Sequence, residues 1–339
     1  MKAAVLKQTG PVENLSENIS VEDILLPEIN EDEVLIKILS ASLNHRDLWI
    51  TEALYSKIKL PIVLGSDGAG TIHSKGINVK DLEPGDEVII NPGINWGEHE
   101  NFQSKEFKIL GMPDNGTLSE YVKVNKDYIF KKPAHLTFEE ASALPLAGIT
   151  AFRSLFKKAV IKNNENVLIT GIGGGVATFA MVFALKAGAN VFVTSGHDHK
   201  IEKAISYGAK NGVNYRNNEW DKKILNLAGD NINVVIDGAG GVNFQKCVDI
   251  CSYGARIVCY GATSGSVKEF SIHKVYWKQL KLMGSTMGSQ KDFEDMIRFI
   301  NEHKVKPVID KTFDLAEVYK AFERMSHSEQ FGKIAISLR

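Results

Sequence analysis

The chain has 339 residues, of which 44% are hydrophobic and 24% charged, as is typical of globular proteins with substantial cores. Its 40 Lys and Arg residues nearly balance 41 Asp and Glu residues, which argues against a nucleic-acid partner or an anionic membrane surface. The longest apolar stretch, residues 171–185, is too short to span a bilayer, and the apolar run near Met1 is too short for a signal peptide.

The cysteines indicate a reducing compartment. Cys247, Cys251 and Cys259 are the only three, an odd number clustered late in the chain, so a disulfide framework is not expected. We interpret them as small buried hydrophobic residues and expect a cytoplasmic protein.

The first 130 residues are predicted to be rich in β-structure. Short runs of β-branched residues are separated by turn signals such as Pro84-Gly85 and Asn115-Gly116. Strands at this spacing favour a small barrel or sandwich. The expected strands are residues 33–39, 69–72, 86–90 and 120–124.

From Thr137 onward, helical stretches alternate with short apolar strands, which predicts a doubly wound parallel sheet with helices on both faces. The expected strands are residues 167–170, 191–194, 234–236, 256–260 and 280–284. After Ser289 we expect helices at residues 292–302 and near 315–324. A last strand at residues 333–337 would return the chain to its β-rich first part.

A glycine-rich turn is the most informative motif. The strand at residues 167–170 runs directly into Gly171-Ile-Gly-Gly-Gly-Val-Ala177, and an apolar helix to about residue 185 and a second strand follow. Glycines allow the tight turn and the close approach of a pyrophosphate, whose charge is stabilised at the helix N-terminus. The order strand, turn, helix, strand predicts a dinucleotide-binding unit.

Seven motifs are spread along the whole chain. They are Met1-Lys-Ala-Ala-Val-Leu6, Asn44-His-Arg-Asp-Leu48, Leu60-Pro-Ile-Val-Leu-Gly-Ser-Asp-Gly-Ala-Gly70, Pro84-Gly-Asp-Glu-Val88, Leu144-Pro-Leu-Ala-Gly-Ile-Thr-Ala151, the glycine turn with its spacing Gly171-x-x-Gly174-x-x-Ala177, and Gly261-Ala-Thr-Ser-Gly265. Together they resemble the medium-chain dehydrogenase/reductase superfamily, specifically its zinc-free quinone-oxidoreductase-like branch. The resemblance implies an α/β fold class: a GroES-like β-rich catalytic domain and a Rossmann NADP(H)-binding domain with a doubly wound parallel sheet, substrate lying in the cleft. We assign residues 1–132 and 290–339 to the first domain and 133–289 to the second.

The same resemblance argues against a bound metal. Asn44 stands where the zinc-dependent branch has a Cys, Ser66-Asp67 stand where it has His-Glu, and Arg46 replaces its proton-relay hydroxyl. An amide and a hydroxyl are poor zinc ligands, and a guanidinium cannot pass a proton. The lobe at residues 91–113 lacks the four cysteines of the structural zinc site. The remaining candidates show no ligand spacing: His45, Asp47, Asp67, His73 and His99.

The second strand of the dinucleotide unit favours NADP(H) over NAD(H). It ends Val193-Thr-Ser-Gly196 without the acid that would accept from the ribose 2′-OH, although Asp198 follows. Lys200 could neutralise a 2′-phosphate, and Tyr215 matches a phosphate-facing tyrosine of the family's NADP users. The predicted cofactor-binding residues are Thr150, Gly171, Gly174, Gly175, Val176, Ala177, Ser195, Gly196, Lys200, Tyr215, Tyr260, Gly261 and Thr263.

The predicted catalytic residues are Asn44, Tyr55 and Asp47. Asn44 and Tyr55 are candidate donors to the acceptor oxygen, and Asp47 is expected to orient its neighbours. A packed surface tyrosine is an equal alternative for Tyr55. For Lys333 the alternatives are an approach to the cofactor from the returning C-terminal strand and a solvated side chain, and we expect the solvated side chain.

The expected activity is NADPH-dependent hydride transfer to a quinone or an α,β-unsaturated carbonyl compound. A zinc-type alcohol dehydrogenase and a crystallin-like protein that holds nucleotide without turnover remain alternatives. We also expect a homodimer, formed through an edge strand near residues 280–286.

Overall fold

The computed structural model describes all residues, Met1–Arg339, and its contacts divide the chain into two units. The first unit comprises Met1–Ile149 and Gly288–Arg339, and the second comprises Thr150–Met287. The boundary differs from the expected residue 132 because α3 (Phe138–Ser142) packs against strands of the first unit.

The sheets of the first unit are antiparallel except where β17 pairs in parallel with β18. The largest has the order β10-β6-β5-β3-β18-β17, and β9 also pairs with β3. Smaller sheets have the orders β2-β1-β4 and β7-β8. The strands are β1 (Lys2–Leu6), β2 (Ile19–Asp23), β3 (Glu33–Ser42), β4 (Ile62–Val63), β5 (Asp67–Lys75), β6 (Glu87–Ile90), β7 (Gly93–Ile94), β8 (Lys108–Ile109), β9 (Tyr121–Asn125), β10 (Ile129–Lys131), β17 (Ile309–Asp314) and β18 (Lys333–Ser337).

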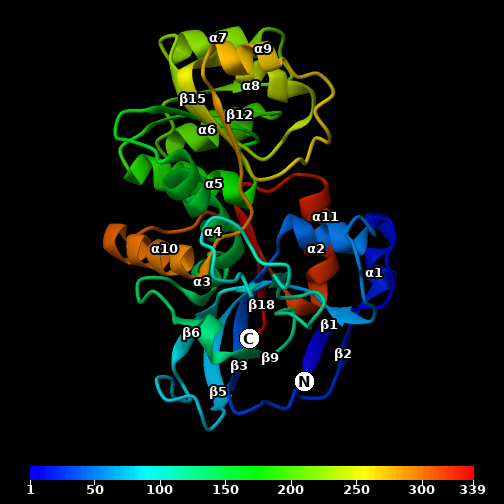
Figure 1. Cartoon of the computed structure of the whole chain (residues 1–339). Coiled ribbons are helices and arrows are strands. Elements are labelled where there is room, and N and C mark those ends of the chain that lie inside the picture. The colour runs from blue at the N-terminus through cyan, green and yellow to red at the C-terminus, as the bar shows by residue number, and fades with distance from the viewer. The chain divides into compact units, whose positions relative to one another are not determined.

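The C-terminal strand completes this unit, as predicted. β18 pairs antiparallel with β3, Ala335 opposite Ser42, and Figure 1 shows the two strands side by side. Alternate residues of β3 face the core, where Ile36 and Ile38 are fully buried with Phe322. The helices of the unit are α1 (Leu15–Asn18), α2 (His45–Thr51), α3, α4 (Pro145–Phe152, which runs into the second unit), α10 (Gln290–His303) and α11 (Val318–Ser326).

The second unit is a doubly wound parallel sheet with the order β13-β12-β11-β14-β15-β16. All neighbouring pairs are parallel, so the carboxyl ends of the strands lie along one edge. The strands are β11 (Asn166–Ile169), β12 (Asn190–Ser195), β13 (Asn211–Asn214), β14 (Ile232–Asp237), β15 (Cys251–Cys259) and β16 (Lys281–Gly284).

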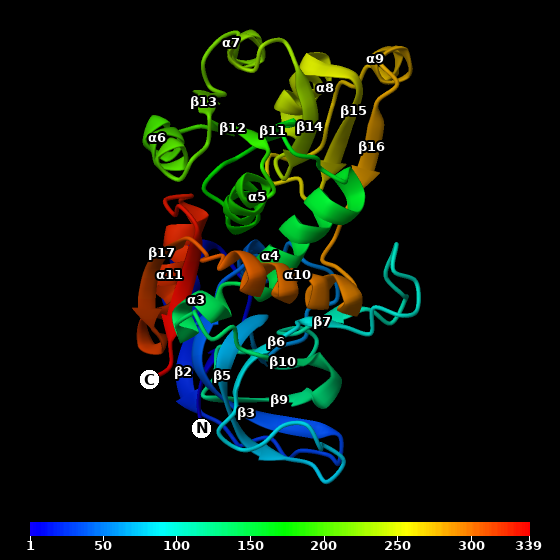
Figure 2. The ribbon, with the colours of Figure 1, turned by 90° about the vertical axis from the view of Figure 1, so that its left-hand side faces the viewer.

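Helices cover both faces of this sheet. Trp220 and Phe244 pack on the face that includes Phe192 and Val235, whereas α5 contacts β11 and β12 from the other face (Figure 2). The helices are α5 (Gly175–Lys186), α6 (Asp198–Ser206), α7 (Trp220–Leu227), α8 (Phe244–Ile250) and α9 (Ile272–Trp277), with a π-helix at Arg153–Ala159. None of the helices in the chain is long and apolar enough to cross a bilayer.

Candidate active site

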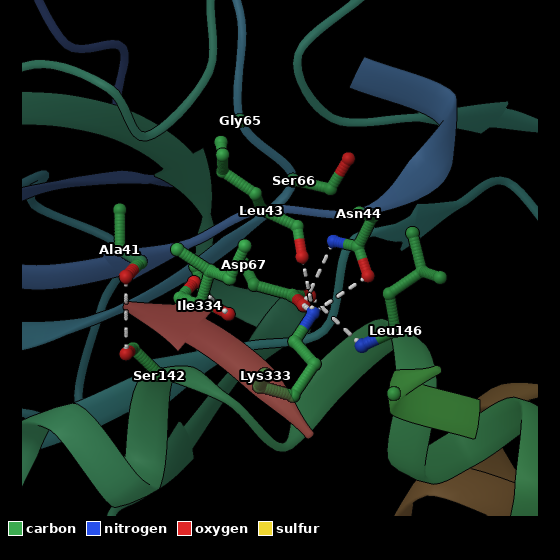
Figure 3. A network of polar contacts seen from close by, with 12 residues as sticks. Ala41, Leu43, Asn44, Gly65, Ser66, Asp67, Ser142, Leu146, Lys333 and Ile334 are labelled. Atoms are coloured by element: carbon green, nitrogen blue, oxygen red, sulfur yellow. Dashed lines mark hydrogen bonds and ion pairs between the residues drawn. The ribbon is translucent and has the colours of Figure 1, made fainter. Parts of the chain in front are cut away.

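A buried lysine lies at the centre of a polar network in the first unit (Figure 3). The Lys333 ammonium donates to the Leu43 carbonyl oxygen at 2.7 Å, to Asn44 Oδ1 at 2.7 Å and to Asp67 Oδ2 at 3.1 Å. The relative exposures of Lys333, Asn44 and Asp67 are 3%, 7% and 0%. The expectation of a solvated Lys333 is therefore wrong.

Sheet topology brings these three residues together. β3 lies between β5 and β18 and is antiparallel to both, so the end of β3 meets the beginnings of its two neighbours. Asp67 begins β5 and lies opposite Ser42, Lys333 begins β18, and Asn44 follows β3 as the N-cap of α2. The sequence predicted the last strand but not this convergence.

Asp67 is bonded through both carboxylate oxygens. Oδ2 accepts from Asn44 Nδ2 at 2.9 Å as well as from Lys333, and Oδ1 accepts from the Leu146 backbone N–H at 2.8 Å. Leu146 lies in the first turn of α4, where a carboxylate is favoured by the helix dipole. Asp67 thereby links the start of a helix to two strand ends.

Asp47 accepts hydrogen bonds from the backbone of the site. Its carboxylate accepts from the N–H groups of Asn44 at 2.9 Å and Gly65 at 3.3 Å, and it lies 3.8 Å from the Arg46 guanidinium. Burial raises the pKa of Asp47, while Arg46 and the Asn44 N–H lower it. Arg46 also donates to Ser66 Oγ at 2.8 Å, so the Ser66 hydroxyl oxygen already has a hydrogen-bond partner.

Tyr55 lies beside this network. Its half-buried ring packs against the core, and the Arg46 guanidinium carbon lies 5.4 Å from the ring centroid. The Tyr55 hydroxyl has no hydrogen-bond partner in the protein.

His45 is the first residue of α2. Burial lowers the pKa of its imidazole to about 4, and the Lys333 charge adds to this effect.

The donor set does not fit a catalytic zinc ion. Asn44 and Ser66 supply an amide and a hydroxyl, and the Asp67 carboxylate is already bonded to an ammonium. Zinc sites in proteins use thiolate, imidazole and carboxylate ligands that are free to bind the metal. No group of three or more His, Cys, Asp or Glu side chains is arranged to hold a metal ion.

In the second unit, the glycine turn has the geometry that a pyrophosphate requires. Gly171 and Gly173 have φ values of +64° and +126°, which favour glycine. Gly174 is the N-cap of α5, and the N–H groups of Gly175, Val176 and Ala177 in its first turn have no acceptor within the helix. Free N–H groups at a helix N-terminus are typical of an anion-binding site, and these lie at the carboxyl end of β11.

Two polar side chains border Gly196 at the carboxyl end of β12. A Cβ atom added to Gly196 would lie 2.8 Å from the Tyr215 hydroxyl and 3.0 Å from Arg216 Nε, so both groups border this glycine. Arg216 was not predicted, although it directly follows Tyr215. Lys200, predicted to neutralise a phosphate, is only 5% exposed.

The residues around this site contribute charge and hydrogen bonds. The pKa of His197 is lowered by desolvation and by the charges of Arg216 and Lys200, which indicates a locally positive environment. Asp198, the counter-argument for NADP(H), begins α6 and accepts from Asn214 Nδ2 at 3.0 Å. Its carboxylate therefore already has a partner within the protein.

The other predicted cofactor residues lie near the same edge of the sheet or in α4. Tyr260 follows β15, and its N–H donates to the Asp237 carbonyl oxygen at 2.9 Å. The Thr263 N–H donates to the Gly238 carbonyl oxygen at 3.2 Å, which draws the loop containing Gly261 toward the end of β14. Thr150 lies near the end of α4, not near its start as expected, and is 5% exposed.

Family models match most of the chain. A model described as the alcohol dehydrogenase GroES-like domain matches residues 30–134, and one described as zinc-binding dehydrogenase matches residues 175–302. Among curated proteins, the chain is similar to the zinc-type alcohol dehydrogenase-like protein YogA of Leptosphaeria maculans, at 35% identity over 92% of each chain.

Solved structures of similar proteins share the fold. A crystal structure of an NAD-dependent alcohol dehydrogenase has 33% identity and a TM-score of 0.94, covering 100% of both chains. The 2-octenoyl-CoA carboxylase reductase CinF, in complex with NADP and 2-octenoyl-CoA, has 26% identity and a TM-score of 0.88. That match covers 99% of this chain and 87% of the other. The β-rich first unit is therefore GroES-like, and the second has the Rossmann fold.

Proposed function

Since the chain belongs to the medium-chain dehydrogenase/reductase superfamily of nicotinamide-dependent oxidoreductases, we propose that it reduces an activated double bond with NADPH. The substrate class is a quinone or an α,β-unsaturated carbonyl compound, and the reaction uses no catalytic metal. Bound NADPH supplies the hydride.

The observation that carries this proposal is the Asn44, Asp67 and Lys333 network. Two of its members, Asn44 and Asp67, stand at metal-site positions of the zinc-dependent branch and are bonded to each other and to Lys333. Charge that develops on an acceptor oxygen must then be stabilised by hydrogen-bond donors. Quinones and enones are electrophilic enough to accept a hydride under those conditions.

Two donors remain available for that oxygen. The Tyr55 hydroxyl has no acceptor, and one of the two Asn44 Nδ2 hydrogens is unused after the bond to Asp67. Both residues belong to the first unit, in which Asp47 fixes the backbone at Asn44. We assign Tyr55 and Asn44 as donors and Asp47 as the residue that orients them.

The coenzyme would be held by the second unit. The free N–H groups at the start of α5 fit the pyrophosphate, and Tyr215 with Arg216 beside Gly196 fits a 2′-phosphate. The two similar structures differ in this respect: one protein is NAD-dependent, whereas the other binds NADP. The positive environment of Gly196 supports NADPH for this chain.

The test of the activity is a spectrophotometric screen of NADPH oxidation. Quinones, enones and enoyl thioesters (CinF binds a thioester) are offered with and without a chelator, and metal content is measured in parallel. We expect turnover of at least one class, unaffected by chelation. Stoichiometric zinc with alcohol oxidation would establish the zinc-type alternative. Coenzyme binding without any turnover would favour the nucleotide-holding protein.

The coenzyme preference has a separate test in Arg216→Glu. Because the new carboxylate would repel a 2′-phosphate but not a 2′-hydroxyl, the KM for NADPH should rise at least tenfold more than the KM for NADH. Lys223→Glu makes the same charge change at an exposed position of α7 and serves as the control. Equal effects on both coenzymes would refute the 2′-phosphate site.

A further inference from the structure

The Lys333 ammonium has no proton left for a substrate. An ammonium group carries three donors, and the three acceptors Leu43 O, Asn44 Oδ1 and Asp67 Oδ2 all lie within 3.1 Å of Nζ. With a relative exposure of 3%, the side chain also has little contact with water. Any effect of Lys333 on the reaction must therefore act through one of these partners.

The partners of Asn44 determine the orientation of its amide. Oδ1 faces Lys333, which can only donate, and Nδ2 faces Asp67, which can only accept when ionised. Rotating the amide by half a turn would place its NH2 group against the ammonium and its oxygen against the carboxylate. Both contacts would be repulsive, so only one orientation is compatible with these neighbours.

We propose that Lys333 is a positioning residue for the reaction, which locks the Asn44 amide so that its one unused N–H is presented to the acceptor oxygen. This inference rests on the proposed function and adds a residue from the C-terminal strand to the site. Lys333 also compensates the charge of Asp67, a carboxylate with 0% exposure. The two roles can be separated by experiment.

The first variant is Lys333→Met, which keeps most of the side-chain volume and removes the charge. Lys132→Met is the matched control, because Lys132 is a buried lysine of the same unit that bonds a carboxylate and a carbonyl oxygen outside the site. We expect kcat to fall about tenfold to a hundredfold in Lys333→Met, since a misplaced donor weakens stabilisation of the transition state. The KM for NADPH and all constants of Lys132→Met should stay within twofold of wild type.

The double variant Lys333→Met/Asp67→Asn separates positioning from charge compensation. Because it removes the buried carboxylate together with its cation, it should recover the thermal stability that Lys333→Met loses. It leaves the Asn44 amide facing a neutral amide, so kcat should remain low. A double variant that regains the wild-type kcat would overturn the positioning role, as would a folded Lys333→Met with kcat within twofold of wild type.

A readout without turnover completes the test. In 15N-labelled, deuterated protein, the Asn44 side-chain amide signals are assigned by their loss in Asn44→Asp. They should shift and broaden in Lys333→Met or, should that variant not fold, in the double variant, and stay unchanged in Lys132→Met. Unchanged signals in the Lys333 variants would refute the proposal. If wild-type protein reduces no electrophile, the proposed function fails, and these signals still decide whether Lys333 orients Asn44.

Discussion

At the level of single residues, the proposed reduction depends on the hydrogen-bond donors that have no acceptor within the protein. The Tyr55 hydroxyl is such a donor, and its ring is held by the core and by the Arg46 guanidinium. Tyr55→Phe removes only the hydroxyl, so we expect kcat to fall about tenfold or more while thermal stability is unchanged. Tyr319→Phe, another half-buried tyrosine packed on the same core, is the control. An unchanged kcat would leave Tyr55 as a packing residue.

His45 makes the stability of the fold depend on pH. Its pKa is lowered to about 4 in the folded protein, from an ordinary value near 6.5, by burial and by the Lys333 charge. Below pH 6.5 the unfolded chain binds a proton that the folded chain does not. The free energy of unfolding should therefore decrease as pH falls from about 6.5 to 4, by up to about 3 kcal/mol.

Urea unfolding at a series of pH values measures this effect. His45→Gln should lose the dependence in that window, whereas His99→Gln, at an exposed position, should retain it. A His45→Gln variant with the wild-type pH dependence would show that other groups cause it.

Some residues of the candidate site could be predicted from the sequence and others could not. Asn44 and Asp47 could be predicted because they lie within one short motif. Lys333 could not, since it lies 266 residues from Asp67 and becomes buried only when β18 pairs with β3. Arg216 could have been predicted from its position next to Tyr215. Its approach to Gly196, however, depends on the path of the chain after β13.

At the level of elements, local pattern predicted many of the apolar strands, but not β1, whose residues Ala3–Leu6 are buried. All five strands expected in the second unit are present, and their ends differ by at most two residues, except that β15 begins at Cys251, five residues before the expected start. Residues 333–337 form β18 as predicted. The sequence pattern did not define the bounds of β13 (Asn211–Asn214) or β17 (Ile309–Asp314), because both segments are largely polar. They form strands because they pair with neighbouring strands of their sheets. Helix α2 was missed, since its polar sequence His45-Arg-Asp does not show the period of a buried helix.

At the level of the whole molecule, β16 is an edge strand that pairs only with β15, which leaves one row of backbone donors and acceptors unpaired. Large hydrophobic side chains lie exposed on this part of the second unit: Tyr253, Ile272, Tyr276, Trp277 and Leu282. An open strand edge with a cluster of exposed aromatic residues is typical of an interface between identical subunits. We therefore expect a homodimer in which the β16 strands of two copies pair.

Light scattering coupled to size exclusion should give twice the chain mass for wild-type protein at micromolar concentration. Trp277→Glu combined with Leu282→Glu places charges of one sign in the interface and should shift the protein to the monomer, because unpaired like charges are costly to bury there. Phe102→Glu changes an exposed aromatic residue of the first unit and should leave the dimer intact. If wild-type protein is a monomer, the exposed face of α9 and β16 requires another explanation. If the Phe102 variant dissociates equally, the interface lies elsewhere.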